Sequence, residues 1–530
     1  MSSQVFLYDT TLRDGAQRQG ISFSVADKLR ITQLLADFGV DYIEGGWPSS
    51  NPKDAEYFRR VQELNLAQSK ICAFGSTRRV DRKAENDAQI IGLLEANTPV
   101  VTLVGKSSVL HVEQILRTSK EENLRLIEDS IRFFKGEGRE VILDAEHFFD
   151  GFLHDPEYAL ACVQAADEAG ADWIVLCDTN GGSLPSQISD ITRRVRERVT
   201  AALGIHAHND CELAVANSLA AVEGGARQIQ GTINGIGERC GNANLISVLP
   251  NLVLKQDYHA NSKTFLAELT NVSRRVGEIA NLTQNQFAAY VGQAAFAHKG
   301  GLHAAAVQRL TASYEHIDPA CVGNGREILV SELSGRGNIR LRAEQLGLDI
   351  GDAETAITEE IKKAEANGLA LEAADGSFEL IVRRHAQHYQ SPFSIRDLMV
   401  QSIRRTGETQ KSLATAKVQV DGAETLTAAE ASGPVAAIDQ ALRQALKPFY
   451  PVIEDVRLTD YKVRILDPES ATSATTRVWL EASMGEHTWC TVGCSENIIE
   501  ASAQALLDSL ELCILRLKER GAHYGRINAA

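Results

Sequence analysis

The sequence lacks the features that would place it in a membrane or on a nucleic acid. No uncharged apolar run in it approaches the roughly 20 residues that span a bilayer. Its first residues show no basic segment, apolar core or cleavage site of a signal peptide. Acidic residues outnumber basic ones by 70 to 54, which gives a formal charge of −16 and argues against a nucleic-acid partner. A small anionic substrate stays compatible with this charge, because a metal ion and a few arginines reverse the field within one cleft.

Cysteine is sparse and shows no pairing pattern. The nine cysteines are scattered, mostly inside apolar segments, and Cys490 and Cys494 lack a second pair at zinc-binding spacing. This usage is typical of reduced thiols, so we expect a cytoplasmic protein. The chain also lacks low-complexity linkers and repeats at solenoid spacing. At 530 residues it is too long for one core, and two or three domains are expected.

From residue 5 to about 255, short apolar runs alternate eight times with segments of helical periodicity. The expected strands are Val5–Tyr8, Tyr42–Glu44, Ile71–Phe74, Val100–Val104, Val141–Leu143, Trp173–Cys177, Gly204–Ala207 and Gln228–Ile233. The expected helices include Ala26–Phe38, Asp54–Leu64, Glu121–Lys135, Pro156–Ala169, Pro185–Val199 and Leu213–Glu223. Such units in this number predict an α/β fold with a closed (β/α)₈ TIM barrel. A doubly wound open sheet is the rival, but it usually carries a G-x-G-x-x-G motif, and none follows the first strand.

Polar residues gather where these strands end. They include Arg13, Asp14, Glu44, Glu146, Asp178, Thr179, His206, His208 and Asn234. In a barrel these positions ring one mouth, where active sites lie. His206 and His208 are two apart on a strand and face the same side, so with Asp14 they predict a divalent-metal site. Taken alone, an Arg–Asp neighbour is usually an exposed ion pair, and an H-x-H pair on a strand can be two satisfied core histidines.

Beyond residue 255 the alternation stops. We expect a helical linker region here. It contains another helical segment that residues 298–307 lead into, and three helices, Lys263–Asn281, Asp352–Asn367 and Ser394–Arg405. From about residue 411 an α+β pattern follows, with strands Ala416–Val420, Val452–Val463, Thr476–Ala482 and Thr488–Cys494 and helices Val435–Leu446 and Asn497–Lys518. We expect a barrel over residues 1–256, a helical linker over 257–408 and an α+β regulatory domain over 409–530.

Three separated motifs carry a resemblance. LYDTTLRDGAQ (7–17), GIHAHND (204–210) and GIGERCGNANL (235–245) together resemble the acyl-CoA:2-oxo acid condensing enzymes, a family that includes 2-isopropylmalate, homocitrate and citramalate synthases. The resemblance covers nearly the whole chain, and EGGWPSSNPKD (44–54) and HKGGLHAAAV (298–307) are most similar to the citramalate-forming members. It implies the condensation of acetyl-CoA with pyruvate and water to give (R)-citramalate and CoA, in isoleucine biosynthesis by a threonine-independent route.

The metal-site roles are expected as follows. The resemblance adds Asn242 to the ligands Asp14, His206 and His208, although an Asn there can equally cap the following helix. Mixed nitrogen and oxygen ligands suit Zn or Mn better than Mg, which stays possible. Arg13 is expected to face the substrate carbonyl oxygen and stabilise developing negative charge.

Further roles follow from the resemblance. Glu146 and Thr179 match positions that contact the oxo acid or orient groups that do. His303 and Tyr314 match residues that reach the active site across a dimer interface, and a neutral His suits a general base. Leu103 is a candidate wall that limits the size of the oxo acid, or else a barrel-core residue.

Other functions stay open from the sequence. These are a 2-isopropylmalate synthase acting on 2-oxoisovalerate, a metal-dependent carbon–carbon lyase on the same barrel, and a Schiff-base aldolase acting through Lys106 just after the fourth strand. The C-terminal domain is expected either to be a dimerisation element or to bind isoleucine as a feedback effector, with backbone donors from Gly493–Glu496. A homodimer is expected.

Overall fold

The computed structural model describes residues 4–66, 68–329, 336–404, 409–485 and 487–519. The chain divides into two compact units. The first comprises Met1–Phe296 with Ile317–Gly325, and the second comprises Ala297–His316 with Arg326–Ala530. The domain boundaries predicted near 256 and 408 stay predictions. Within the described ranges, every helix is too short or too polar to cross a bilayer.

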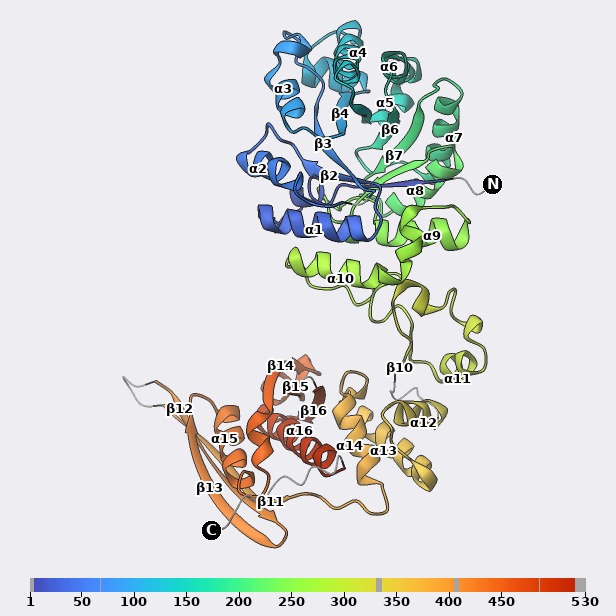
Figure 1. The fold of residues 1–530 in the computed structure, drawn as a ribbon. Helices are drawn as coiled ribbons and strands as arrows, with labels where there is room; N and C mark the ends of the chain where they lie inside the picture. The colour runs from blue at the N-terminus through green and yellow to red at the C-terminus, as the bar shows by residue number, and fades with distance from the viewer. Residues whose placement is uncertain (1–3, 67, 330–335, 405–408, 486, 520–530) are drawn as a thin grey trace. The chain divides into compact units, whose positions relative to one another are not determined.

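The first unit contains a closed barrel of eight parallel strands in sequential order, as predicted. The strands are β1 (Phe6–Asp9), β2 (Tyr42–Gly46), β3 (Lys70–Ser76), β4 (Val100–Lys106), β5 (Glu140–Glu146), β6 (Trp173–Asp178), β7 (Ala202–Ala207) and β8 (Gln228–Gly231). Figure 1 shows these strands inside a ring of helices. The predicted eighth strand was too long at its end, because Ile233 belongs to a short 3₁₀ turn.

The barrel helices begin and end on residues that suit those positions. They are α1 (Val25–Asp37), α2 (Pro52–Val61), α3 (Ala88–Glu95), α4 (Lys120–Gly136), α5 (Phe148–His154), α6 (Pro156–Ala169), α7 (Pro185–Arg196), α8 (Ala214–Glu223) and α9 (Leu245–Lys255). Ser24 forms a capping box with Asp27 before α1, and Gly170 at φ 92° ends α6 in the left-handed conformation. The main core lies between the strands and these helices.

The segment after the barrel differs from its prediction. Lys263–Asn281 was expected as one helix, but a 3₁₀ stretch over Asn261–Glu268 precedes α10 (Leu269–Ile279). The tighter stretch lies against the turn that follows α1, where the Ser262 hydroxyl donates to the Gly39 carbonyl oxygen over 2.8 Å. A return segment, residues 317–325, packs back on this unit through Val322, whose carbonyl accepts from Thr270 over 2.7 Å.

The second unit begins with a small sheet and helices and ends with two strand–helix layers. Its first elements are β9 (Ala297–His298), α11 (Gly301–Arg309), β10 (Glu327–Ile328), α12 (Arg336–Gln345), α13 (Glu354–Ala366) and α14 (Asp375–Arg384). Two antiparallel three-stranded sheets follow, β11–β12–β13 and β14–β15–β16. Their elements are β11 (Ser394–Ile403), β12 (Lys411–Val420), β13 (Ala423–Ala431), α15 (Pro434–Leu446), β14 (Arg457–Ile465), β15 (Thr476–Met484), β16 (His487–Ser495) and α16 (Ile498–Glu519). This arrangement confirms the predicted α+β class of the C-terminal domain.

Three predictions fail in this unit. Ser394–Arg405 was expected as a helix, but its described part up to residue 404 contains strand β11, and Arg405 lies outside the described residues. β13 was not predicted, because its Ala, Glu and Thr content lacks the β-branched and aromatic bias of strands. Val452–Val463 begins with a 3₁₀ turn at Pro451–Asp455 before β14 starts, since Pro451 at the first position favours a turn.

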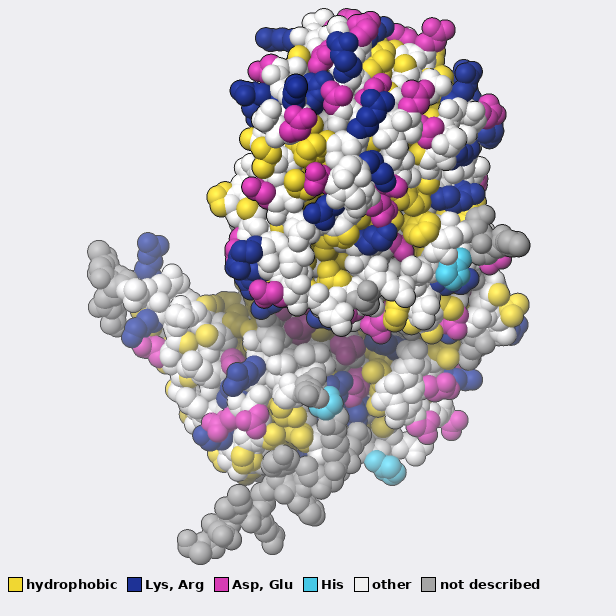
Figure 2. Space-filling view, turned by 45° about the horizontal axis from the view of Figure 1, so that its top comes forward, with side chains coloured by type: hydrophobic (Ala, Val, Ile, Leu, Met, Phe, Trp, Pro, Cys, Tyr) yellow, Lys and Arg dark blue, Asp and Glu magenta, His cyan; other side chains and the backbone are white. Residues whose placement is uncertain are grey.

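Charged side chains of both signs cover the face drawn in Figure 2. Lys and Arg are interspersed with Asp and Glu over the barrel, with apolar side chains between them. The charge on this face is therefore mixed, although acidic residues outnumber basic ones in the whole sequence.

Candidate active site

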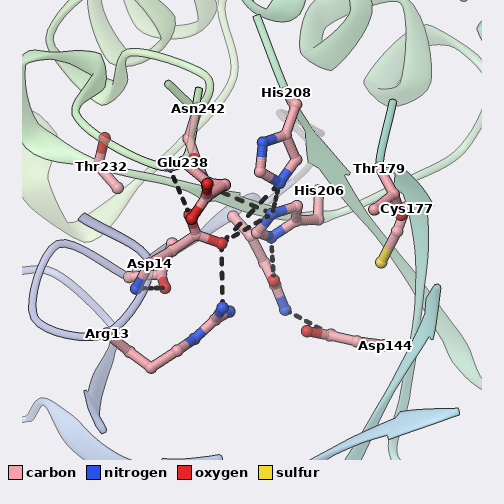
Figure 3. Close-up of polar contacts among 12 residues, drawn as sticks. Arg13, Asp14, Asp144, Cys177, Thr179, His206, His208, Thr232, Glu238 and Asn242 are labelled. Atoms are coloured by element: carbon pink, nitrogen blue, oxygen red, sulfur yellow. Dashed lines mark hydrogen bonds and ion pairs between the residues drawn. The ribbon is translucent and has the colours of Figure 1, made fainter. Parts of the chain in front are cut away.

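Asp14, His206 and His208 meet at the carboxyl-terminal mouth of the barrel (Figure 3). Asp14 follows β1, while His206 lies on β7 and His208 just beyond it. The two Nε2 atoms are 3.2 Å apart, and Asp14 Oδ2 lies 3.7 Å from His206 Nε2 and 3.9 Å from His208 Nε2. All three side chains are buried, with exposed fractions of 3–6%. The structure therefore brings together the three residues predicted to bind a metal ion.

The donor atoms around this cluster fit a divalent cation. Asn242 Nδ2 lies 3.3 Å from His206 Nε2, and the backbone of Asn242 pairs with that of His208. Among the described residues, the buried Asn242 Oδ1 and His208 Nδ1 have no hydrogen-bond partner. A buried carboxylate, two facing imidazole nitrogens and an unpartnered amide oxygen are costly to keep together without a positive charge between them. Nitrogen and oxygen donors of this kind suit divalent metals.

The electrostatics keep two of these ligands, Asp14 and His208, in their metal-binding protonation states. Burial opposes ionisation of Asp14, but Arg13 and the two histidines outweigh it and lower the pKa of the carboxyl to about 2. Burial, with the neighbouring His206, lowers the pKa of His208 to about 3. At neutral pH the site therefore presents a carboxylate and a neutral imidazole.

A second layer of polar side chains orients His206. Its Nδ1 lies 2.8 Å from Gln230 Oε1, and Gln230 Nε2 donates to Asp144 Oδ1 over 2.8 Å (Figure 3). Because the Gln230 amide group points at Asp144, its carbonyl is left to accept from His206 Nδ1–H, which frees Nε2 for the metal. Burial and the nearby Glu44 raise the pKa of Asp144 to about 8. Neither Gln230 nor Asp144 is among the site residues predicted from the sequence.

Arg13 is fixed beside the cluster. Its Nη1 donates to Asp14 Oδ2 over 3.0 Å, its Nε donates to Glu44, and its guanidinium lies 3.9 Å from the centre of the Phe74 ring. Glu44 is completely buried and also accepts from the hydroxyls of Tyr8 and Thr10. The arginine predicted to face the substrate is thus held in one orientation, and Glu44 is a positioning residue that the sequence analysis placed at a strand end without a role.

A cavity of about 700 Å³ reaches Asp14 and His208, and a recess of about 70 Å³ is lined by all three residues of the cluster. Glu146 and Thr179 line both, and their predicted contacts with the oxo acid stay predictions. Glu146 is paired with Lys106, the last residue of β4. Thr179 Oγ1 accepts from the backbone N–H of His147 over 2.8 Å, so its hydroxyl hydrogen stays available to a ligand.

The structure does not support Leu103 as a pocket wall. Leu103 is fully buried in the layer between strands and helices, whereas the next residue, Val104, lines both the cavity and the recess. Neighbouring residues of a strand face opposite sides, so the wall position belongs to Val104. This corrects the predicted wall, and the alternative of a core residue describes Leu103.

His303 and Tyr314 lie in the second unit, on α11 and just after it. Their rings stack with centroids 4.0 Å apart, and both side chains are exposed. Their predicted roles at the barrel site stay predictions.

Comparisons with known proteins identify the family. The HMGL-like family model matches residues 4–276, the homocitrate synthase post-HMGL domain-like model residues 290–368, and the LeuA allosteric (dimerisation) domain residues 372–514. An (R)-citramalate synthase from Aquifex aeolicus is 48% identical over 98% of this chain and 100% of its own length. Another from Synechocystis is 50% identical over 96% of each chain. This chain belongs to the (R)-citramalate synthase family.

Membership of the (R)-citramalate synthase family confirms the resemblance seen in the three motifs. A probable 2-isopropylmalate synthase from Methanopyrus kandleri is also related, at 32% identity over 96% of this chain and 98% of its own length. The lower identity places that enzyme further away than the citramalate synthases. The cluster of Asp14, His206 and His208 agrees with the metal dependence of the HMGL-like family.

Proposed function

We propose that this chain condenses acetyl-CoA with pyruvate and water, giving (R)-citramalate and CoA. The observation that carries the proposal is the buried Asp14–His206–His208 cluster beside the fixed Arg13, at the edge of a small recess. The full-length identity to (R)-citramalate synthases supports the same reaction.

A divalent metal ion is the cofactor in this proposal. Asp14, His206 and His208 would hold it, with Asn242 beside them. When bound, the ion acts as a Lewis acid that polarises a carbonyl group. Mixed nitrogen and oxygen donors favour Zn or Mn over Mg.

The chain's own residues supply the remaining charge stabilisation. The Arg13 guanidinium lines the recess and would stabilise negative charge that develops on the oxo acid's carbonyl oxygen. Thr179, whose oxygen already accepts from His147 N–H, would donate its hydroxyl hydrogen to the pyruvate carboxylate. Glu146, paired with Lys106, would help to orient the reactants. We keep His303 as the proposed general base for the acetyl methyl group, with Tyr314 as its stacking partner.

The recess favours a small oxo acid. Val104 lines both the recess and the larger cavity, and its branched side chain beside the metal ligands suits the methyl group of pyruvate better than the branched group of 2-oxoisovalerate. The same metal cluster would also serve a carbon–carbon lyase, so the direction of reaction has to be measured.

A CoA-release assay tests the proposal. Purified protein, stripped of metal and resupplied with Zn, Mn or Mg, is given acetyl-CoA with pyruvate, 2-oxobutyrate or 2-oxoisovalerate in turn. We expect metal-dependent CoA release that is fastest with pyruvate, with citramalate as product, and loss of this activity in His206→Ala. Faster release with 2-oxoisovalerate, or cleavage of citramalate without synthesis, would contradict the proposed function.

We further propose a cytoplasmic homodimer inhibited by isoleucine, the end product of the threonine-independent route. The match of residues 372–514 to the LeuA allosteric (dimerisation) domain supports both dimer formation and feedback regulation. Light scattering of the intact protein tests the dimer directly.

A further inference from the structure

The large cavity above the metal cluster extends to the loop that follows β3. Five basic side chains line it, namely Arg13, Arg78, Arg79, Lys106 and Arg239. Four of them form ion pairs. These pairs are Arg13 with Asp14 and Glu44, Arg78 with Glu122 and Asp129, Lys106 with Glu146, and Arg239 with Asp210.

Arg79 differs from the other four. Its side chain is exposed, and within the described part of the chain no carboxylate lies within ion-pair distance of it. The same holds for Lys83, four residues on. Arg82, between them, lies 4.0 Å from the carboxylate of Asp81, at the limit of an ion pair. The loop therefore presents two exposed cations, Arg79 and Lys83, that no described carboxylate pairs with, alongside the acidic Asp81 and Glu85.

The backbone of this loop is fixed by a buried anchor. The Arg78 guanidinium pairs with Asp129 and donates to the carbonyl oxygens of Arg79 and Arg82 over 3.2 and 3.1 Å. The N–H of Arg79 donates to Asp87 over 2.7 Å. A fixed backbone that presents exposed cations lowers the ordering cost of binding an anion.

A second hollow of about 740 Å³ lies on the other side of the same loop. Arg82 and Lys83 line it, and it shares Arg78, Val80 and Asp81 with the first cavity. Residues of this loop therefore line both the cavity beside the metal cluster and a second, polar hollow.

We propose that Arg79 and Lys83 bind the phosphate groups of the acyl-CoA substrate while its thioester arm lies in the cavity above the metal cluster. This inference rests on the proposed function for the identity of the substrate. CoA joins a diphosphate and a 3′-phosphate to its reacting thiol through a long, uncharged arm. Such a ligand needs unpaired cations at a distance from the reacting carbon, and the basic side chains beside the metal cluster are already paired.

Binding measurements test the proposal separately from catalysis. Calorimetry of the full-length protein is carried out with CoA and with pantetheine, which lacks every phosphate group. The test variant is the double substitution Arg79→Ala with Lys83→Ala. The control is Arg59→Ala, an exposed arginine of α2 that lines neither hollow.

We expect the double variant to bind CoA at least about 10-fold more weakly than the unchanged protein, because two charge-assisted contacts are lost. Pantetheine should bind equally to both, and Arg59→Ala should leave CoA affinity unchanged. Equal CoA affinity in the double variant and the unchanged protein would overturn the inference. A different result would contradict the proposed function alone. In that case no oxo acid in the panel supports CoA release, while CoA binding still depends on Arg79 and Lys83.

Discussion

Arg13 is held on three sides by other parts of the barrel. Asp14 and Glu44 accept its hydrogen bonds, and Phe74 packs on the flat face of its guanidinium. Such fixed groups stabilise developing charge without reorganising, so their benefit is realised in the transition state more than in substrate binding.

The substitution Arg13→Lys should therefore act on turnover. A lysine ammonium keeps the charge but loses the planar group that contacts Glu44, Asp14 and Phe74 together. We expect kcat to fall by about 100-fold or more, with little change in the KM for pyruvate. Steady-state kinetics at saturating acetyl-CoA measure both constants. A rise confined to KM would show that Arg13 only binds the oxo acid.

Gln230 offers a test of the layer behind the metal cluster. Gln230→Leu removes the acceptor for His206 Nδ1–H and the donor to Asp144, so His206 loses its fixed orientation. Metal affinity should fall by about 10- to 100-fold, and excess metal should restore turnover. A competition assay with a chromogenic chelator measures that affinity.

Gln228, on the same strand, is the matched control. It is also fully buried, but among the described residues its amide has no hydrogen-bond partner. Gln228→Leu should leave metal affinity unchanged, and the free energy of unfolding should stay equal or rise, because an unsatisfied amide is removed. If metal affinity falls equally in both variants, the loss comes from disturbing strand β8 and not from removing the contact with His206.

Sequence patterns predicted the metal ligands but not the residues that orient them. His206, His208 and Asp14 stand out because they interrupt or follow apolar runs at the ends of strands. Gln230 lies within a four-residue strand, where nothing local tells whether its amide faces the barrel interior or the helices. For the same reason, the sequence does not tell which of Leu103 and Val104 faces the barrel interior. That depends on the register of their strand with the neighbouring strands.

At the scale of elements, the loop between β8 and α9 contacts the metal cluster through Asn242. A Cβ on Gly237 would lie 2.0 Å from Asn242 Oδ1, far inside contact distance. Gly182, in another loop of the first unit, has no atom within 4 Å of such a Cβ. A methyl group at position 237 would therefore clash with Asn242, whereas one at position 182 would meet no neighbouring atom.

Gly237→Ala should displace Asn242 and weaken metal binding, whereas Gly182→Ala should not. We expect a loss of unfolding free energy of about 1–3 kcal/mol for Gly237→Ala, because the loop must shift to accept the methyl group. Chelator competition and denaturant unfolding of both variants provide the measurement. Normal metal affinity in Gly237→Ala would remove Asn242 from the proposed metal shell.

The misassigned strand β11 shows why some elements resist prediction. Ile395, Leu398 and Val400 are the residues of β11 that pack on the domain core. A bulge between Ile395 and Asp397 adds one residue to the strand, so the first two of these core positions are three residues apart. Three-residue spacing is the signature of a helix, whereas the barrel strands, buried on both faces, carry no such ambiguity.

For the whole molecule, the grouping of His303 with the C-terminal domain matters most. Residues 297–316 belong to the same compact unit as both three-stranded sheets. No local sequence pattern predicts this grouping, because it depends on contacts between segments far apart in the chain. A ligand that favours one arrangement of this unit can therefore act on the proposed catalytic residues His303 and Tyr314 within the same unit.

We expect the proposed isoleucine response to depend on the packing of β16 against α16. The turn expected to donate backbone N–H groups overlaps the end of β16, and Cys494 N–H is already donated to Gln504. A Cβ on Gly493 would lie 2.0 Å from the carbonyl oxygen of Ala501, so the strand and helix are in close contact there. Gly433, before α15, has no atom within 4 Å of such a Cβ and serves as the control.

We expect isoleucine to bind the full-length protein by calorimetry and to inhibit CoA release, with leucine acting more weakly. Gly493→Ala should abolish inhibition while uninhibited kcat stays near normal, because the methyl group separates β16 from α16 and changes no residue of the barrel. Gly433→Ala should remain sensitive, and a chain ending near residue 405 should be insensitive. If the full-length protein binds no isoleucine, the C-terminal domain has a structural role only; if Gly493→Ala stays fully sensitive, the effector site lies away from the contact between β16 and α16.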